Sequence, residues 1–369
     1  MADIDRNYMR LALREAKKGI GRTSPNPCVG AVVVKNNRVV GRGYHKQAGT
    51  PHAEIHALRE AGKRAKDATL YVTLEPCNHT GRTPPCTEAI LRAGIGRLVI
   101  GMLDPNPRVA GGGAAALESK GLAVSSSILE NECREINLPF IKHSTTGLPW
   151  VVVKAGMSID GKIAAGPGQS TRITGQKSLR RLHVLRNQVD AILIGIGTGL
   201  IDDPSLTARL HQRSGRDPLR LVLDAELRLP VSAKMIQQDS SAQTWIFCAR
   251  GVDKNKRSKL EKAGAVVKPV PVSKGNLNLN AVLTELGKAQ ITSVLVEGGS
   301  KVHGSFLQAN LVDQILLFIA PVFLGDQGVS LVHFTGKKKT ETLSQFEIMS
   351  TRRYGEDVLI DGRFNHKKQ

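Results

Sequence analysis

Apolar residues recur along the chain at two different spacings, and the change between them predicts the order of helices and strands. Residues 4–18 repeat apolar side chains every three or four positions, which predicts a helix at the start. Two dense β-branched runs follow at 29–34 and 39–44, and the polar segment 35–38 between them predicts a hairpin. The chain therefore opens with a helix and two antiparallel strands.

Strands alternate with helices through the rest of the chain. A helix capped by Thr50 is expected over 52–61, and another from Thr83, because a hydroxyl residue followed by proline is typical of a helix start. Such alternation predicts α/β architecture, with a mixed sheet in the first half. The further strands are expected at 69–74, 98–102, 122–125, 150–155, 191–195, 220–224, 244–248, 293–297 and 314–319, and the further helices at 114–119 and up to about 143.

The chain is long enough for two domains. It has 369 residues, of which 41% are apolar and 23% charged, so disorder is excluded as its dominant state. Ser144-Thr145-Thr146-Gly147 has the composition of a linker, and the two halves carry different motifs. We therefore expect one domain at 1–146 and another at 147–369.

Charge and cysteine content narrow the possible partners. The net charge is +20, and both halves contribute to it without a long basic tail, which favours small phosphorylated ligands over a basic arm that binds nucleic acid. Five cysteines do not form a disulfide framework, and no apolar run approaches the length of a membrane span. We expect a cytoplasmic protein that does not bind membranes.

One ordered group of residues has the chemistry of a catalytic zinc site. His52, Cys77 and Cys86 would supply three ligands and leave the fourth position of Zn²⁺ to water. Glu54 would then move protons between that water and a leaving amine. Residues two apart do not share a helix face, so we expect His52 and Glu54 at an irregular first turn. The His-x-Glu…Pro-Cys pattern is typical of zinc-dependent base deaminases.

Glycine-containing segments of the second half are ambiguous. No Gly-x-Gly-x-x-Gly fingerprint occurs, so a standard dinucleotide fold is not supported. Residues 195–199 and 297–300 each follow a predicted strand, and each could cradle phosphate with backbone N–H groups or simply form a tight turn.

Segments 76–86, 25–30, 43–45 and 104–107 resemble the deaminase domain of the bifunctional deaminase/reductase family of riboflavin biosynthesis. Several stretches within 154–209, and Glu297-Gly298-Gly299, resemble the reductase domain of that family. The resemblance implies a cytidine-deaminase-like α/β/α domain followed by a dihydrofolate-reductase-like α/β domain. It implies zinc-dependent loss of the 2-amino group from a diamino-phosphoribosylaminopyrimidine, and then NADPH-dependent reduction of the product's ribose to ribityl.

The resemblance also implies site residues. Around the deaminase substrate it places Asn26, His45, His79, Thr80 and Arg82, and around the reductase substrate Ser170, Arg186, Leu206, Arg209 and Glu297. At NADPH it places Gly156, Arg172, Thr198, Asp202, Gly299, Ser300, Lys301, Val302, His303, Gly304 and Ser305. Arg172 stands where the family often has an aromatic residue, and Gly112 where it often has a basic one.

Two alternatives compete with this interpretation. A nucleic-acid base deaminase, acting for example on tRNA and carrying an accessory domain, would explain the +20 charge and the His-x-Glu…Pro-Cys motif. The nine-residue step from Cys77 to Cys86 and the large second half argue against it. A zinc-stabilised RNA-binding module would need a fourth protein ligand and no Glu54. The favoured expectation is a homo-oligomeric enzyme that acts on phosphorylated pyrimidines and binds no nucleic acid.

Overall fold

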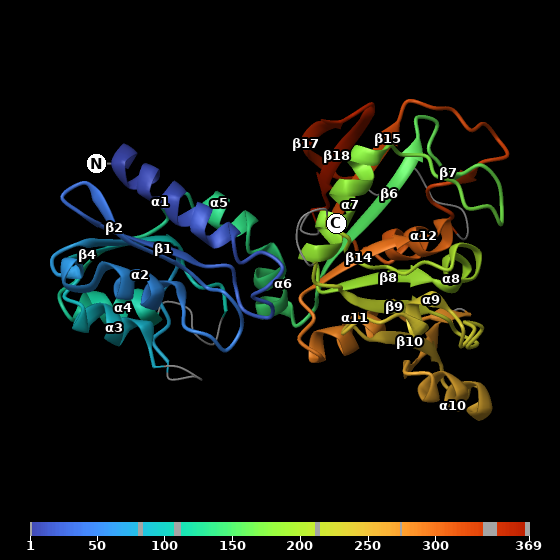
Figure 1. Ribbon diagram of the computed structural model, residues 1–369, viewed down its shortest axis with the longest axis horizontal. Coiled ribbons are helices and arrows are strands. Elements are labelled where there is room, and N and C mark those ends of the chain that lie inside the picture. Colours follow the sequence, from blue (N-terminus) through green and yellow to red (C-terminus); the bar gives the residue numbers. More distant parts are fainter. Residues whose placement is uncertain are drawn as a thin grey trace. The chain divides into compact units, whose positions relative to one another are not determined.

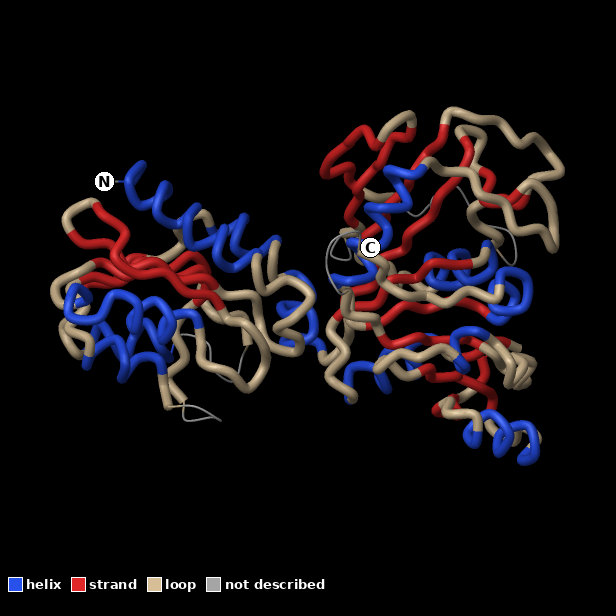
Figure 2. Tube along the Cα trace, viewed as in Figure 1, coloured by secondary structure: helices blue, strands red, loops and turns tan. Residues whose placement is uncertain are grey.

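The computed structural model describes residues 2–79, 84–106, 112–210, 215–273, 275–334 and 345–365. It divides into two units, Met1–Gly147 and Leu148–Gln369, and each unit combines its own sheet with its own helices (Figure 2). The helix expected from Thr83 begins at Cys86, with Pro85 at its N-cap, and Thr83 itself lies outside the described residues.

A five-stranded mixed sheet forms the centre of the first unit. Its order is β2-β1-β3-β4-β5, with β1 antiparallel to both neighbours and β3, β4 and β5 parallel. Asn36 and Asn37 take φ values of 49° and 57°, which form the tight turn between β1 and β2. The strands are β1 (Gly30–Lys35), β2 (Arg38–Tyr44), β3 (Thr69–Leu74), β4 (Arg97–Met102) and β5 (Ala123–Ser125).

Helices cover both faces of this sheet, which gives the expected α/β/α layers (Figure 1). Helices α1 and α5 lie on one face, and α2, α3 and α4 on the other. A Cβ atom at Gly30 would lie 2.0 Å from the Ala12 carbonyl oxygen, so α1 packs directly on the backbone of β1. The helices are α1 (Ala2–Lys17), α2 (Ala53–Ala61), the 3₁₀ turn η1 (Gly62–Ala65), α3 (Cys86–Arg92), α4 (Gly112–Ser119), α5 (Glu130–Glu135) and α6 (Leu138–Thr146).

The second unit contains a nine-stranded sheet in the order β11-β10-β9-β8-β14-β6-β15-β18-β17. Neighbours from β11 to β15 run parallel, whereas β18 pairs antiparallel with both β15 and β17. The strands of this sheet are β6 (Trp150–Ser158), β8 (Ala191–Gly195), β9 (Leu219–Leu223), β10 (Thr244–Ala249), β11 (Val266–Val270), β14 (Ser293–Gly298), β15 (Gln314–Ala320), β17 (Glu347–Tyr354) and β18 (Asp357–Arg363). Two small ribbons pair β7 (Lys162–Ala164) with β16 (Val329–Ser330), and β12 (Val272–Ser273) with β13 (Asn276–Leu277).

Alternating side chains divide the second unit's core between the two faces of the sheet. On β6, Val152 packs into one cluster, and Val151 and Val153 pack into the other. Helices α7 and α10 contribute to the first cluster, and α11 and α12 to the second. The helices are α7 (Gln176–Gln188), α8 (Ile196–Asp202), α9 (Lys234–Gln237), α10 (Lys254–Lys262), α11 (Leu279–Lys288) and α12 (Ser300–Gln308).

Two local expectations were wrong. Thr50 does not cap α2, because its hydroxyl donates to the Gln47 carbonyl and the N-cap is His52. Ser144, Thr145 and Thr146 are not a linker but the last turn of α6, which ends at Gly147 with φ 74°. Their hydroxyls bond carbonyls three or four residues back, which satisfies polar groups inside the helix.

Candidate active sites of the two units

Three metal-ligating side chains converge where α2 and α3 begin. His52 precedes α2 in extended conformation, Cys77 follows β3, and Cys86 is the first residue of α3. His52 Nδ1 lies 3.2 Å from Cys86 Sγ and 3.5 Å from Cys77 Sγ, and all three ligand atoms lie within 4.8 Å of one another. Tetrahedral Zn²⁺ with ordinary bond lengths separates its N and S ligands by about 3.5 Å. This donor set therefore fits zinc with one coordination position open.

Glu54 lies beside these ligands in the first turn of α2. Since His52 precedes the helix with φ −73° and ψ 167°, both side chains reach the same site, and the expected irregular first turn is confirmed. The Glu54 carboxylate is 3% exposed, and its Oε2 has no hydrogen-bond partner among the described residues. Burial raises the pKa of Glu54, which makes its carboxyl group a better proton carrier near neutral pH.

Cys77 accepts hydrogen bonds that favour its thiolate form. The Cys86 backbone N–H donates to Cys77 Sγ over 3.4 Å. Hydrogen bonds from Cys86 and His52 lower the pKa of Cys77, which favours the thiolate that a metal requires.

A second pair of polar side chains forms a wall next to the ligands. Asn26 Nδ2 lies 3.0 Å from His45 Nε2, and the rings of His45 and His52 meet edge to face at 5.4 Å. His45 Nδ1 faces the Pro51 carbonyl at 3.3 Å, so Nδ1 is the donor and Nε2 accepts from Asn26. The structure thus brings Asn26 and His45 to the metal ligands. His79 is exposed, and Thr80 and Arg82 lie outside the described residues.

Glu75 is a supporting residue that sequence reasoning missed. Its buried carboxylate accepts from the backbone N–H groups of Asp104, Gly113 and Ala114 over 2.9–3.1 Å. A Cβ atom at Gly113 would lie 1.9 Å from the Pro76 carbonyl oxygen, so α4 packs against the segment that carries Cys77. The signals in the sequence were the acidic residue before Pro-Cys and the run of three glycines at 111–113.

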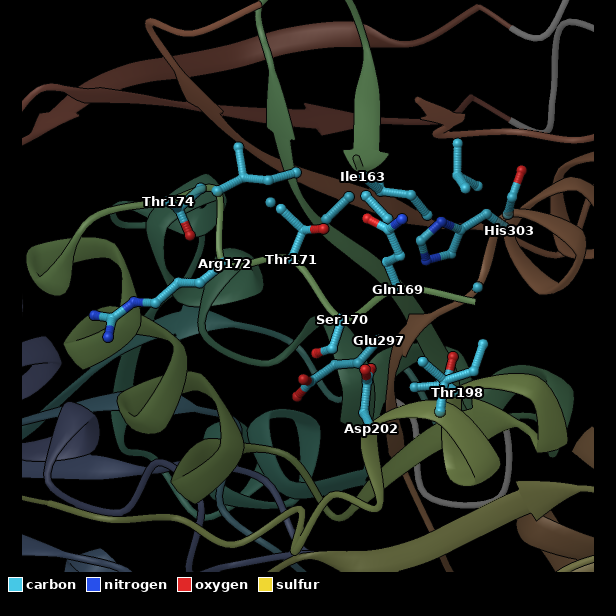
Figure 3. A pocket seen from close by; sticks show the side chains of 18 of the residues that line it. Ile163, Gln169, Ser170, Thr171, Arg172, Thr174, Thr198, Asp202, Glu297 and His303 are labelled. Atoms are coloured by element: carbon cyan, nitrogen blue, oxygen red, sulfur yellow. The ribbon is translucent and has the colours of Figure 1, made fainter. Parts of the chain in front are cut away.

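The second unit holds a cavity of about 340 Å³ at the carboxyl ends of β6 and β14 (Figure 3). Ligands of parallel α/β sheets usually bind at this edge. Nine of the residues expected around substrate or NADPH line it: Gly156, Ser170, Arg172, Thr198, Asp202, Glu297, Gly299, Ser300 and His303.

Glycines at the rim of this cavity leave room for a ligand to approach the backbone. Gly299 has φ 86°, and a Cβ atom at Gly298 would lie 3.2 Å from Thr198 Oγ1. Gly299 precedes α12, so free N–H groups of the first helical turn are available to phosphate. These features fit a dinucleotide. In contrast, residues 196–202 form α8 and not a glycine-rich loop.

A buried ion pair borders the cavity. Arg186 donates from Nε and Nη2 to the two oxygens of Glu297, over 2.8 Å and 2.7 Å. Burial would raise the pKa of Glu297, but Arg186 and Lys154 outweigh it and hold that pKa below its usual value. Arg186 also donates to the Thr207 carbonyl, which links α7 to the segment that carries Arg209. Arg209 itself is exposed, and its Nε donates to Thr207 Oγ1.

The remaining expected residues lie outside the cavity, and Arg172 contributes only to its rim. The side chain of Leu206 is 2% exposed and packs in the core, with φ 52°. Arg172 lies at the rim, but its guanidinium points away from the other labelled side chains and donates to Gln176 (Figure 3). Four other α12 residues expected at NADPH do not line the cavity, namely Lys301, Val302, Gly304 and Ser305.

Lys154 is a cavity residue that sequence reasoning missed. It is the only charged side chain on β6, and its Nζ lies 5.6 Å from the centre of the Phe318 ring. Burial lowers the pKa of Lys154, while Glu297 opposes this effect. A lysine inside an otherwise apolar strand was the available signal.

Comparison with known proteins agrees with these two sites. A model of the cytidine and deoxycytidylate deaminase zinc-binding region matches residues 2–102, and a model of the RibD C-terminal domain matches residues 149–360. The riboflavin biosynthesis protein RibD of Aquifex aeolicus is 42% identical over 95% of this chain and 99% of its own length. The Escherichia coli RibD is 41% identical over 96% of this chain and 98% of its own length. The chain belongs to the RibD family.

Solved structures of RibD proteins have the same fold. One form of Acinetobacter baumannii RibD superposes with a TM-score of 0.90, at 33% identity, over 99% of this chain and 100% of its own. The Thermotoga maritima diaminohydroxyphosphoribosylaminopyrimidine deaminase/5-amino-6-(5-phosphoribosylamino)uracil reductase superposes with a TM-score of 0.86, at 34% identity, over 99% of each chain.

Membership of the RibD family confirms the main functional expectation. The protein is a bifunctional enzyme of riboflavin biosynthesis, with a zinc-binding deaminase domain and an NADPH-dependent reductase domain. Within the described part of the chain, no helix is long and apolar enough to cross a membrane.

Proposed function

We propose that residues 1–146 deaminate 2,5-diamino-6-(5-phosphoribosylamino)pyrimidin-4(3H)-one and that residues 147–369 reduce the ribosyl group of the resulting uracil to ribityl. The Thermotoga maritima relative is described as a deaminase and reductase of these compounds. The observation that carries the first half is the convergence of His52, Cys77 and Cys86 beside the buried Glu54.

In the deaminase site, His52, Cys77 and Cys86 would hold Zn²⁺, which supplies a water molecule activated at neutral pH. Glu54 takes one proton from the attacking water and delivers it to the departing amine, and the second water proton passes to the neighbouring ring nitrogen. The water oxygen stays on the ring as a carbonyl oxygen, and the amino group leaves as ammonia. Because His45 accepts from Asn26 Nδ2, the Asn26 Oδ1 is left to accept from an N–H of the pyrimidine. His79, Thr80 and Arg82 would contact the substrate's sugar phosphate.

In the reductase site, NADPH supplies a hydride to C1 of the ribose group. The N–H groups at the start of α12 would bind the dinucleotide's phosphates, with Gly156, Thr198 and Asp202 around the rest of it. Arg209, whose guanidinium is exposed, would bind the substrate's phosphate, and Ser170 and the Arg186–Glu297 pair would bind its polar groups. The Lys154 ammonium lies in the same cavity and can protonate the atom bonded to C1.

We further propose a homo-oligomer in a reducing cytoplasm, without nucleic acid as a partner. The five cysteines, all within the described residues, form no disulfide. Strand β17 is the last strand of its sheet and exposes Ile348 and Met349, and such an edge is commonly covered by another chain. Light scattering measures the mass of the particle, and a monomer at micromolar concentration would contradict the oligomer.

A coupled assay tests the two-site function. Ammonia release and NADPH oxidation are followed separately on the phosphoribosylaminopyrimidine, with zinc measured in the same sample. His52→Ala should lose zinc and deamination but still reduce substrate that is already deaminated, whereas Arg209→Ala should raise the reductase KM alone. Cys248→Ala, which removes a buried cysteine of the second unit, serves as the control that keeps zinc. Loss of both activities in a folded His52→Ala variant would overturn the two-site arrangement.

A further inference from the structure

His303 contributes a buried hydrogen-bond acceptor to the reductase cavity. It lies in the first turns of α12, lines the cavity, and is 2% exposed. Its Nδ1 lies 3.2 Å from the Leu331 carbonyl oxygen. Since a carbonyl oxygen can only accept, Nδ1 carries the hydrogen, and in a neutral ring Nε2 carries the lone pair.

The surroundings of His303 keep its ring neutral. Burial lowers the pKa of His303 to about 4. The hydrogen bond to the Leu331 carbonyl raises this pKa, and the Lys154 ammonium lowers it further. At neutral pH the imidazole is therefore uncharged, and Nε2 is an acceptor only.

This Nε2 has no partner among the described residues, although it is fully buried. Buried polar atoms nearly always have a hydrogen-bond partner, so one is expected from a molecule that fills the cavity. The partner must be a donor, an N–H or O–H group.

The part of the cavity next to His303 is largely apolar. Leu331 follows β16, which pairs with β7 through Val329 and Ala164, and both of these residues line the cavity together with Ile163. Figure 3 shows the His303 ring beside Ile163 and Gln169, while Glu297 and Ser170 lie at another part of the cavity. Apolar walls together with the His303 Nε2 acceptor and the Gln169 amide suit a flat heteroaromatic ring that carries an amide N–H.

We propose that His303 Nε2 accepts a hydrogen bond from the carboxamide N–H of the nicotinamide ring of NADPH, and thereby fixes which way the ring lies for hydride transfer. The proposal rests on the proposed function in one respect, that this cavity binds the dinucleotide. It adds a ring-orienting contact to the phosphate contacts at the start of α12.

Calorimetric titration of the full-length, zinc-loaded protein tests the contact with three probes. They are NADPH, its reduced 3-acetylpyridine analogue, in which a methyl group replaces the amide NH₂, and 2′-phospho-ADP-ribose, which lacks the nicotinamide. The unmodified protein should bind NADPH about tenfold more tightly than the acetylpyridine analogue, as expected for one hydrogen bond to a buried acceptor. His303→Leu should lose this preference, and His303→Gln, which keeps an acceptor, should retain part of it.

Two comparisons separate this effect from general damage. 2′-Phospho-ADP-ribose should bind equally to all three proteins, and His333→Ala, which alters an exposed histidine of the neighbouring segment, should preserve the full preference. If His303→Leu does not fold, the unmodified protein and His303→Gln decide the question.

The proposal is overturned if the unmodified protein does not discriminate between the two reduced dinucleotides, or if His303→Leu still does. It is also overturned if His303→Leu changes only the substrate KM, since the donor would then belong to the substrate. Failure of the unmodified protein to bind NADPH at all would instead refute the proposed function of the cavity.

Discussion

Replacing Arg186 with leucine should destabilise the second unit by leaving the Glu297 carboxylate buried and without its main partner. The side chains of Arg186 and Glu297 are only 12% and 7% exposed, and they are joined by two hydrogen bonds. Removing one member of such a pair costs about 3–5 kcal/mol, because the other charge stays buried. Lys154 is near enough to lower the pKa of Glu297, so we expect the lower end, about 3 kcal/mol.

The cost should depend on pH in one direction. In the native protein the pKa of Glu297 is lowered from 4.5, so its ionised form stabilises the fold above the unfolded pKa, and this stabilisation is lost as pH falls through the folded pKa. Without Arg186, burial acts with less opposition and raises the pKa of Glu297. The carboxyl group of the variant then becomes neutral as pH is lowered from 7 towards 4.5, and the destabilisation shrinks.

Tryptophan fluorescence isolates this unit, since Trp150 and Trp245 are the two tryptophans of the chain. Urea unfolding at pH 7 and at pH 5 gives the free energy of unfolding of each variant. Arg257→Leu, which breaks a half-exposed pair with Glu261, is the matched control and should cost less than about 1 kcal/mol. A cost below about 1 kcal/mol for Arg186→Leu at pH 7, or one that grows on acidification, would refute the reasoning.

Three further predictions concern the first unit. Glu54→Gln should keep zinc but reduce ammonia release by roughly 10²–10⁴-fold, and unchanged release would exclude Glu54 as the proton carrier. Gly30→Ala should lower the melting temperature of the unit by several degrees, because the new Cβ would lie 2.0 Å from the Ala12 carbonyl oxygen. Calorimetry measures the melting temperature, and an unchanged value would contradict this close approach. Tyr71→Phe removes a 2.7 Å hydrogen bond to the buried Asp5 and should cost roughly 1–3 kcal/mol in urea unfolding followed by circular dichroism, whereas a neutral result would mean that Asp5 is satisfied without it.

Strands buried on both faces were predictable, because their apolar runs need no knowledge of their neighbours. Residues 69–74 and 191–195 were expected as strands and form β3 and β8 with these bounds. Strand β17 was not expected, since its side chains are mostly exposed and show no alternation. It becomes a strand through its pairing with β18, a contact that no local pattern encodes.

The zinc site could be predicted from local sequence, whereas the reductase cavity depends on contacts made in the fold. His52, Glu54, Cys77 and Cys86 could be found from the sequence because zinc chemistry restricts both the residue types and their order. A lysine or histidine in the second unit has no such restriction, since its chemistry depends on which groups the fold places beside it. His303 becomes an oriented acceptor only because the Leu331 carbonyl, 28 residues later, takes the hydrogen of Nδ1 and the cavity leaves Nε2 unpaired. The function of such residues depends on which hydrogen bonds they make in the folded chain, and the spacing of residues along the sequence does not predict those bonds.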